Sequence, residues 1–311
     1  MPDFLKPFIK KLFRLFFSEQ SFEAYSKERL LLPGCSDENL LVQYQKGNLA
    51  KIEKPLSFYY DELWVGLEKR VKQKKPFVYI RASDGEANFL LGKFVGNVGR
   101  RHYTADDKIP AASIDLFRDG LLSCDSRHVE MYRNTRRDFK KIFGQNIFSP
   151  IPFECLYAII SSRKIFNSPW RIGIIGADNK IEIIKELFKH QQYQDYIGRS
   201  AFDGYIGVPE KGTSNQPLEL AQSIIKRLDP SIDIYLVGIG IAKLAVLPEL
   251  KKSSRSVFFD AGAGVSALAG LVSAHRQYFA DWINFRLKDF NYSAVDIMDA
   301  NLQSSTNSKW L

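Results

Sequence analysis

The residues best suited to chemistry lie in one short segment, Arg81-Ala82-Ser83-Asp84-Gly85-Glu86. An apolar run of strand length, residues 77–80, precedes it and predicts a rigid element that holds it in place. Gly85 lets the backbone turn without a Cβ clash, so that the carboxylates of Asp84 and Glu86 can face one cation. Hard divalent metals such as Mg²⁺ use one or two protein carboxylates beside water and phosphate oxygens. The segment therefore favours a metal-assisted nucleotide site.

The context of this segment is more specific than its spacing. A D-x-E triplet is expected about once in a chain of this length. This one is the only D-x-E in the sequence, no D-x-D occurs, and Arg81 stands between the triplet and the apolar run. A guanidinium can bind a phosphate through two parallel hydrogen bonds, or it can pair with the acids and cap the next helix. Both roles of Arg81 stay open at this point.

Composition places limits on the classes of protein to consider. The chain has 311 residues, of which 45% are hydrophobic and 25% charged, enough for one large core or two modest ones. Its three cysteines are odd in number and widely spaced, which fits neither a disulfide framework nor a zinc site and favours a reducing compartment. The net charge of +9 favours anionic partners. The basic runs carry no nucleic-acid motif, so we expect no nucleic-acid partner.

Residues 4–17 predict an amphipathic helix, with phenylalanines and leucines on one side and Lys10, Lys11 and Arg14 on the other. The segment is shorter than the roughly 20 apolar residues of a spanning helix and lacks the features of a signal peptide. A basic amphipathic helix suits an anionic membrane surface, although packing onto its own domain or a partner is the alternative. We expect a cytoplasmic protein, and attachment to the inner face of the plasma membrane is a hypothesis.

Strand and helix signals alternate along the rest of the chain. We expect strands at residues 77–81, 170–176, 205–208, 232–237 and 256–260, with helices between them. Short crossovers give parallel neighbours, so the predicted fold is α/β: an open, mostly parallel Rossmann-like sheet with flanking helices, plus the N-terminal helix. The predicted organisation is an extension at residues 1–50, one domain at 51–290 with a helical insertion at about 92–165, and a polar, frayed tail at 291–311.

Ligands of open parallel sheets bind beyond the carboxyl ends of the strands. We therefore expect residues of the turns that follow the strands to bind a cofactor or substrate, namely Arg81, Ser83, Gly176, Asp178, Asn179, Lys180, Gly238 and Gly240. A loose dinucleotide pattern also occurs at Gly262-Ala263-Gly264. It closes the predicted sheet instead of beginning it, so we interpret its glycines as positions of close helix-to-strand packing.

The segment Arg81 to Glu86 resembles the Arg-Phe-Gly-Asp-Gly-Glu signature of the GT-D class of bacterial glycosyltransferases. The resemblance covers about residues 58–285, because three later blocks follow in the family's order: Trp170 to Lys180, Ile234 to Leu247 and Val257 to Gly262. It implies a single Rossmann-like domain that binds a UDP-sugar with Mn²⁺ or Mg²⁺. The family's Asp-Ile-Gly-His-x-Asp run is only partly present here, since the histidine and the second acid are missing after Asp260.

Carried over residue by residue, the resemblance gives Asp84 and Glu86 the metal, Arg81 the diphosphate and Lys180 a secondary phosphate contact. Asp260 matches the acid of the last strand. If transfer inverts configuration, a general base is needed, and we place Asp260 first because strand-end acids face the cleft. The other acids considered for this role are Asp203, Glu154 and Asp178.

The expected function is metal-dependent transfer of a hexosyl group from a nucleotide sugar, UDP-linked by the resemblance, to a glycan, glycolipid or glycoprotein acceptor in bacterial surface-glycan synthesis. A lipid-linked acceptor would agree with a membrane-binding N-terminal helix. Two alternatives stay open. One is a nucleotide-cofactor enzyme, a methyltransferase or dehydrogenase, that uses the turns at Gly238 or Gly262. The other is a non-catalytic binding module of a glycan assembly system.

Overall fold

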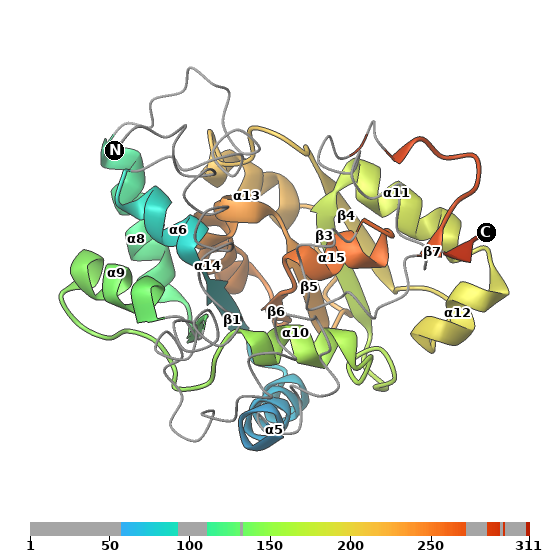
Figure 1. The fold of residues 1–311 in the computed structure, drawn as a ribbon, viewed down its shortest axis with the longest axis horizontal. Coiled ribbons are helices and arrows are strands. Elements are labelled where there is room, and N and C mark those ends of the chain that lie inside the picture. Colours follow the sequence, from blue (N-terminus) through green and yellow to red (C-terminus); the bar gives the residue numbers. More distant parts are fainter. Residues whose placement is uncertain (1–56, 93–110, 131–132, 272–284, 293–294, 296–308) are drawn as a thin grey trace, which may run out of the picture.

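The computed structural model describes residues 57–92, 111–130, 133–271, 285–292, 295 and 309–311. Within them, six parallel strands form one sheet in the order β2-β1-β6-β5-β3-β4 (Figure 1). The predicted open, parallel α/β sheet is confirmed. Its strands are β1 (Phe77–Ala82), β2 (Ser126–Val129), β3 (Ile172–Ala177), β4 (Gly204–Val208), β5 (Ile234–Gly238) and β6 (Val257–Asp260).

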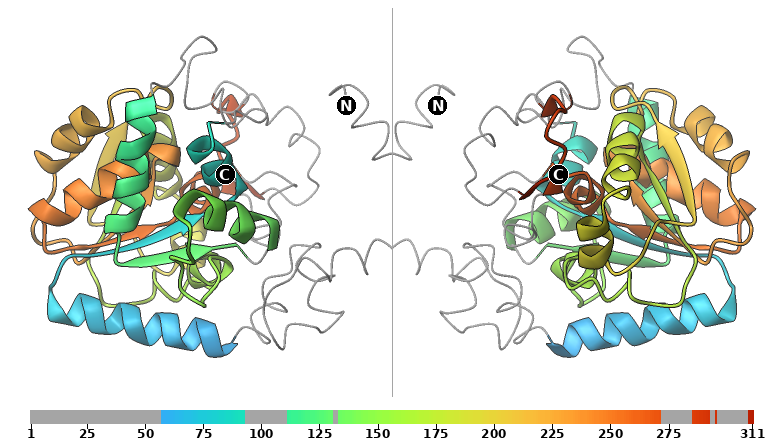
Figure 2. Two further views of the ribbon diagram at one scale, coloured as in Figure 1. Left: turned by 90° about the vertical axis from the view of Figure 1, so that its left-hand side faces the viewer. Right: turned by 90° about the vertical axis from the view of Figure 1, so that its right-hand side faces the viewer.

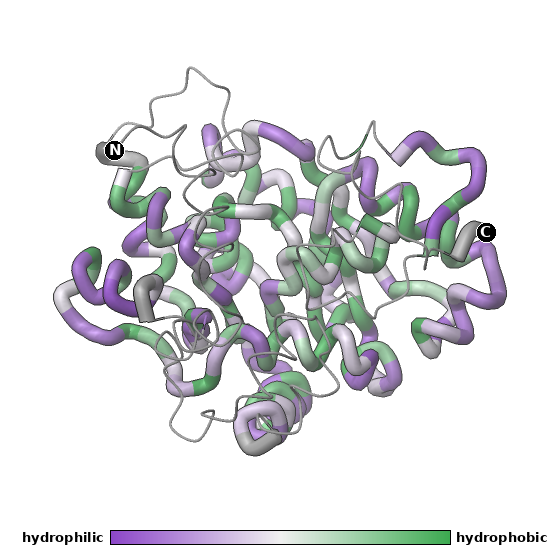
Figure 3. Tube along the Cα trace, in the orientation of Figure 1, coloured by the Kyte–Doolittle hydropathy of each residue, from purple (hydrophilic) through white to green (hydrophobic). Residues whose placement is uncertain are grey.

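Each face of the sheet buries its own core, because successive side chains of a strand point to opposite faces. Tyr79 and Phe259 lie in one core, and their neighbours Val78 and Phe258 lie in the other. The middle of the tube is mostly green to white in Figure 3, while purple segments lie mostly on the outer helices and loops. Burial on both faces explains why the central strands read as continuous apolar runs.

Helices cover both faces of the sheet, and α5 lies along one side of the molecule (Figure 2). The core of Tyr79 is covered by α5 (Ser57–Gln73), α10 (Glu154–Ser161), α11 (Asp178–Leu187), α12 (Gln191–Ile197) and α15 (Ala263–Leu268). The core of Val78 is covered by α6 (Asp84–Leu90), α8 (Ala111–Ser123), α9 (Arg133–Phe143), α13 (Pro217–Ile225) and α14 (Lys243–Ser253). A short 3₁₀ helix, η1 (Gly240–Ala242), leads into α14.

Two segments contain a short strand that the sequence did not predict. The segment 92–165, predicted as a helical insertion, also contributes β2, which pairs in parallel with β1 at the sheet edge. The sequence Ser126–Val129 contains one apolar residue and therefore carries no strand pattern. The C-terminal segment, predicted as a frayed tail, includes β8 (Lys309–Trp310), which pairs with β7 (Phe285–Arg286).

The predicted amphipathic helix at residues 4–17, like the whole extension at 1–50, lies outside the described residues. Among the helices that the structure does describe, none is long and apolar enough to cross a membrane.

Candidate functional site

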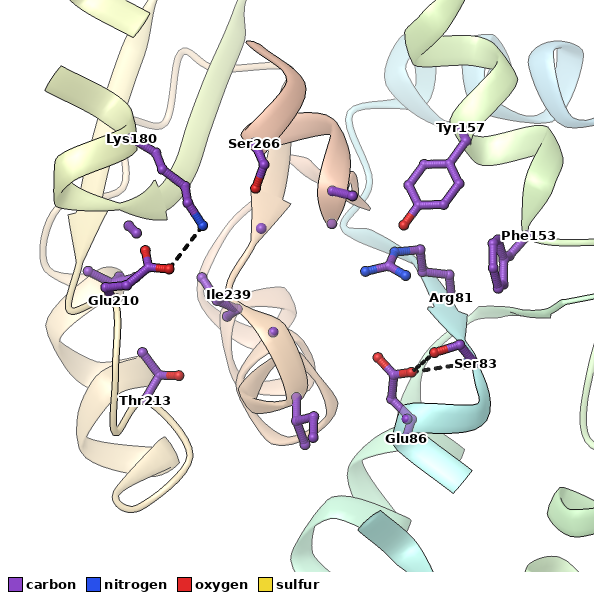
Figure 4. A pocket seen from close by; sticks show the side chains of 18 of the residues that line it. Arg81, Ser83, Glu86, Phe153, Tyr157, Lys180, Glu210, Thr213, Ile239 and Ser266 are labelled. Carbon is purple, nitrogen blue, oxygen red and sulfur yellow. Dashed lines mark hydrogen bonds and ion pairs between the residues drawn. The ribbon is translucent and has the colours of Figure 1, made fainter. Parts of the chain in front are cut away.

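A cleft of about 320 Å³ opens at the carboxyl edge of the sheet. It extends from the loop after β1, across the turns after β5 and β6, to the loops after β3 and β4 (Figure 4). This is the edge at which open parallel sheets bind ligands. The predicted site residues that line the cleft are Arg81, Ser83, Asp84, Glu86, Lys180, Gly238 and Gly240.

Four charged side chains form a buried cluster under one wall of the cleft, which we call the charge quartet: Arg81, Glu86, Lys243 and Asp260. Lys243 Nζ lies 2.8 Å from Glu86 Oε1 and 2.7 Å from Asp260 Oδ2. Arg81 Nε lies 3.2 Å from Asp260 Oδ1. The contacts of Lys243 Nζ and Arg81 Nε are ion pairs without hydrogen-bond geometry. With two cations and two anions, the quartet is formally neutral.

The local sequence explains how Glu86 reaches the quartet. Ser83 is the N-cap of α6, and Glu86 at the third helical position forms a capping box with it. Glu86 Oε2 accepts hydrogen bonds from the Ser83 backbone N–H, at 2.9 Å, and from the Ser83 hydroxyl. Burial raises the pKa of Glu86, but the charges of Lys243 and Arg81 outweigh burial and hold this pKa well below its usual range. Glu86 is therefore a buried, ionised anchor.

The guanidinium of Arg81 points into the cleft (Figure 4). Asp260 holds it from behind, through the ion pair and through a 3.1 Å hydrogen bond from the Arg81 backbone N–H to Oδ2. Its Cζ lies 5.1 Å from the ring centroid of Tyr157 and 5.8 Å from that of Phe153. Among the described residues, no hydrogen bond or ion pair engages its terminal Nη1 and Nη2 atoms. These two donors have the geometry that binds a phosphate or carboxylate.

Lys180 provides a second cation at the opposite wall (Figure 4). Its Nζ lies 3.1 Å from Oε1 of Glu210, which also lines the cleft. An anion bound between the two walls would therefore meet Arg81 on one side and compete with Glu210 for Lys180 on the other.

Several predicted residues do not line the cleft. At Gly176 a Cβ would lie 2.9 Å from Val265 Cγ1, so this glycine lets α15 pack on the sheet. Asp178 packs over Gly207 of β4, and the side chain of Asn179 accepts a 2.8 Å hydrogen bond from the Lys180 backbone N–H. The sequence predicts that the glycines of the turn after β6 serve close packing, and this holds for only one of the two. Gly264 contacts the Ile160 side chain of α10, whereas Gly262 makes room for Arg81.

The predicted general bases are misplaced for that role. Asp260 does not face the cleft as expected, because it is 1% exposed and held by Arg81 and Lys243. Asp203 accepts a hydrogen bond from the backbone of Ile172, the first residue of β3, and so lies at the opposite edge of the sheet. Glu154 and Asp178 do not line the cleft either.

The sequence interpretation missed Glu130, an acid that lines the cleft directly after β2. Its backbone N–H donates to the carbonyl of Ala82 at 3.3 Å, and its carboxylate accepts a hydrogen bond from the Thr135 hydroxyl. Burial raises the pKa of Glu130 to about 8, and the nearby acids, Asp84 among them, add to this effect. Glu130 was missed because β2 gave no signal in the sequence.

A Glu130→Gln variant is expected to be more stable than the wild type at pH 8, by about 2–4 kcal/mol. The pKa of Glu130 rises on folding from 4.5 to about 8, so the folded state loses stability as pH rises through that interval. Glutamine removes the titration and keeps an acceptor for Thr135. Urea unfolding at pH 5, 6.5 and 8 should show a gain that grows with pH. An exposed control, Glu182→Gln, should change little, and a pH-independent gain at position 130 would contradict this account.

The predicted two-carboxylate metal site does not fit the side chains found here. Asp84 is exposed and lines the cleft, but each oxygen of Glu86 already has partners, Lys243 on one and Ser83 on the other. In the part of the chain that the structure describes, no group of three or more His, Cys, Asp or Glu residues is arranged to hold a metal ion. A metal on Oε1 of Glu86 would lie next to the ammonium group of Lys243, and one on Oε2 would compete with Ser83.

Comparison of the chain with protein-family models, with curated proteins and with solved structures gives no match. Function is therefore inferred from the cleft and from the residues that line it.

Proposed function

We propose that the protein is a glycosyltransferase that moves a sugar from a nucleotide sugar, UDP-linked, to a hydroxyl group of a glycan, glycolipid or glycoprotein acceptor. One observation carries the proposal. The Arg81 guanidinium is fixed from behind by Asp260 and presents two unengaged donors to a cleft at the carboxyl edge of a parallel sheet. The same arginine opens the segment that resembles the GT-D signature.

The donor diphosphate is placed against Arg81, which can bind two of its oxygens at once. Lys180 supplies a second positive charge from the other wall once a phosphate replaces Glu210. The turn after β5 contributes Gly238 and Gly240 to the lining, and Gly240 has φ of +59°, a backbone conformation that suits glycine. The rings of Tyr157 and Phe153 supply apolar surface beside the guanidinium.

In the transfer step, the acceptor oxygen forms a bond to the anomeric carbon while the bond from that carbon to the diphosphate oxygen breaks. Negative charge builds on the leaving diphosphate, and a cation that is already oriented stabilises it without reorganisation. Arg81 fits this role because Asp260 fixes its direction. The proton of the acceptor hydroxyl passes to a base if transfer inverts. Glu130 replaces Asp260 as the proposed base, since it lines the cleft and burial holds its pKa at about 8, near neutrality.

Calorimetric titration of the full chain with UDP-, GDP- and CMP-sugars tests the proposal. Arg81→Met is expected to weaken binding of the preferred nucleotide sugar on the order of 100-fold or more, because two charge-assisted hydrogen bonds are lost. Arg70→Met is the matched control. Arg70 belongs to α5, lies over the ring of Phe77 and does not line the cleft. No binding by any nucleotide sugar, or equal binding by both variants, would contradict the proposed function.

A further inference from the structure

We propose that Lys243 takes the place of a divalent cation beside Glu86, so that Glu86 is not a metal ligand and the donor diphosphate binds without a metal ion held by this acid. The identity of the donor rests on the proposed function. The part that concerns Glu86 and Lys243 rests on the charge quartet alone. This inference departs from the metal site that the family resemblance implies.

The first argument is that both oxygens of Glu86 already contact other groups. Lys243 Nζ lies 2.8 Å from Oε1, and Ser83 donates two hydrogen bonds to Oε2. A Mg²⁺ ion binds carboxylate oxygens at about 2.1 Å in a near-ideal octahedron. An ion on Oε1 would thus occupy space next to the ammonium group, where two positive charges repel at short range.

The second argument is that Lys243 cannot readily leave. Its side chain is 1% exposed, and it begins α14, in which the next residues, Leu244 to Leu247, are all buried. Withdrawing the ammonium group would also strip Asp260 of its 2.7 Å contact. A carboxylate left buried without its cation is strongly destabilising, so the contacts of Lys243 are coupled to the integrity of this wall.

The third argument is charge balance. The quartet joins two cations, Arg81 and Lys243, to two anions, Glu86 and Asp260, and three of these side chains are less than one-tenth exposed. Without a bound diphosphate, a divalent ion added here would leave an uncompensated charge of +2 beside the buried quartet, which is costly. Within the neutral quartet, Asp260 holds the Arg81 guanidinium, whose positive charge faces the cleft.

The metal alone gives the first test. The full-length wild type and Glu86→Gln are titrated with Mn²⁺, and free Mn²⁺ is followed by electron paramagnetic resonance. Circular dichroism and thermal unfolding establish that the variant is folded. We expect the two titration curves to agree within about threefold in apparent Kd. A site present in the wild type and lost on Glu86→Gln would overturn the inference. This test does not depend on any nucleotide.

UDP binding gives the second test, measured by calorimetry in EDTA and in Mn²⁺. We expect the wild-type Kd to change by less than about threefold between the two conditions. If Mn²⁺ tightens binding and Glu86→Gln keeps that gain, the ion is held elsewhere and the inference stands. If Mn²⁺ tightens binding at least about tenfold and Glu86→Gln loses the gain, the inference fails. Absence of UDP binding in both conditions would count against the proposed function, and the Mn²⁺ titration would still decide on Glu86.

Discussion

Replacing Lys243 with methionine is expected to lower the free energy of unfolding by about 3–5 kcal/mol, the loss typical of removing one partner from a buried ion pair. Methionine fills much of the space of the lysine stem but carries no charge. The carboxylates of Glu86 and Asp260, 7% and 1% exposed, would then share the single cation Arg81. Urea unfolding followed by circular dichroism at pH 7 measures the loss.

The matched control is Lys252→Met, which removes an exposed lysine of the same helix from its ion pair with Glu249. Surface pairs of this kind contribute about 0–1 kcal/mol, so the control should change little. Adding Glu86→Gln to Lys243→Met removes one orphaned charge and should restore at least about half of the loss, as interacting sites are not additive. Strictly additive losses in the double variant would show that the two side chains do not interact.

The ion pair between Lys243 and Glu86 also determines how the stability of the fold changes as pH falls. Burial alone would raise the pKa of Glu86, but Lys243 and Arg81 lower it from 4.5 to well below the usual range. A lowered carboxyl pKa adds stability that is present above about pH 4.5 and is lost as pH falls further. Lys243→Met should therefore flatten the stability curve of the chain below about pH 4.5 relative to the wild type.

Local sequence patterns were sufficient for most of the sheet. Strands β1, β3, β5 and β6 are apolar runs followed by helix signals, and each was expected within a few residues of its position. The strand β2 was missed because its sequence, Ser126–Val129, is not an apolar run. It lies at the edge of the sheet, where it is only partly buried, and it is stabilised by pairing with β1. Because β2 was not predicted, Glu130, which directly follows it, was not predicted to lie at the site either.

The site was most predictable where its residues are close in sequence, although Lys180, Gly238 and Gly240 also line the cleft as expected. Arg81, Ser83, Asp84 and Glu86 lie in one segment, and all of them line the cleft as expected. Lys243 was not proposed, because a lysine at the start of a helix is usually solvated and almost never fully buried without a partner. Its partners come from β6 and α6, which only the tertiary fold brings together. The same contacts turn Asp260 away from the cleft, so its misassignment has the same cause.

Among glycine-to-alanine substitutions of residues that line the cleft, Gly262→Ala is expected to weaken donor binding most. A Cβ at this position would lie 1.9 Å from Arg81 Nη2 and 2.3 Å from Cζ, so the guanidinium would have to move off the turn. Gly262 also has φ of +47°, which disfavours alanine. If Arg81 binds the diphosphate through two charge-assisted hydrogen bonds, UDP affinity should fall on the order of 100-fold. Calorimetry with UDP measures the effect directly.

Backbone strain by itself has to be separated from displacement of Arg81, and the chain offers a control. Gly144 has φ of +72°, but a Cβ there would meet no atom within 4 Å. Gly144→Ala should therefore cost about 1–3 kcal/mol of stability through strain alone and leave the UDP Kd nearly unchanged. If Gly262→Ala weakened UDP binding no more than Gly144→Ala does, the guanidinium beside this turn would not be what holds the diphosphate. If only Gly262→Ala raises the UDP Kd, donor binding depends on the position in which Asp260 holds the Arg81 guanidinium.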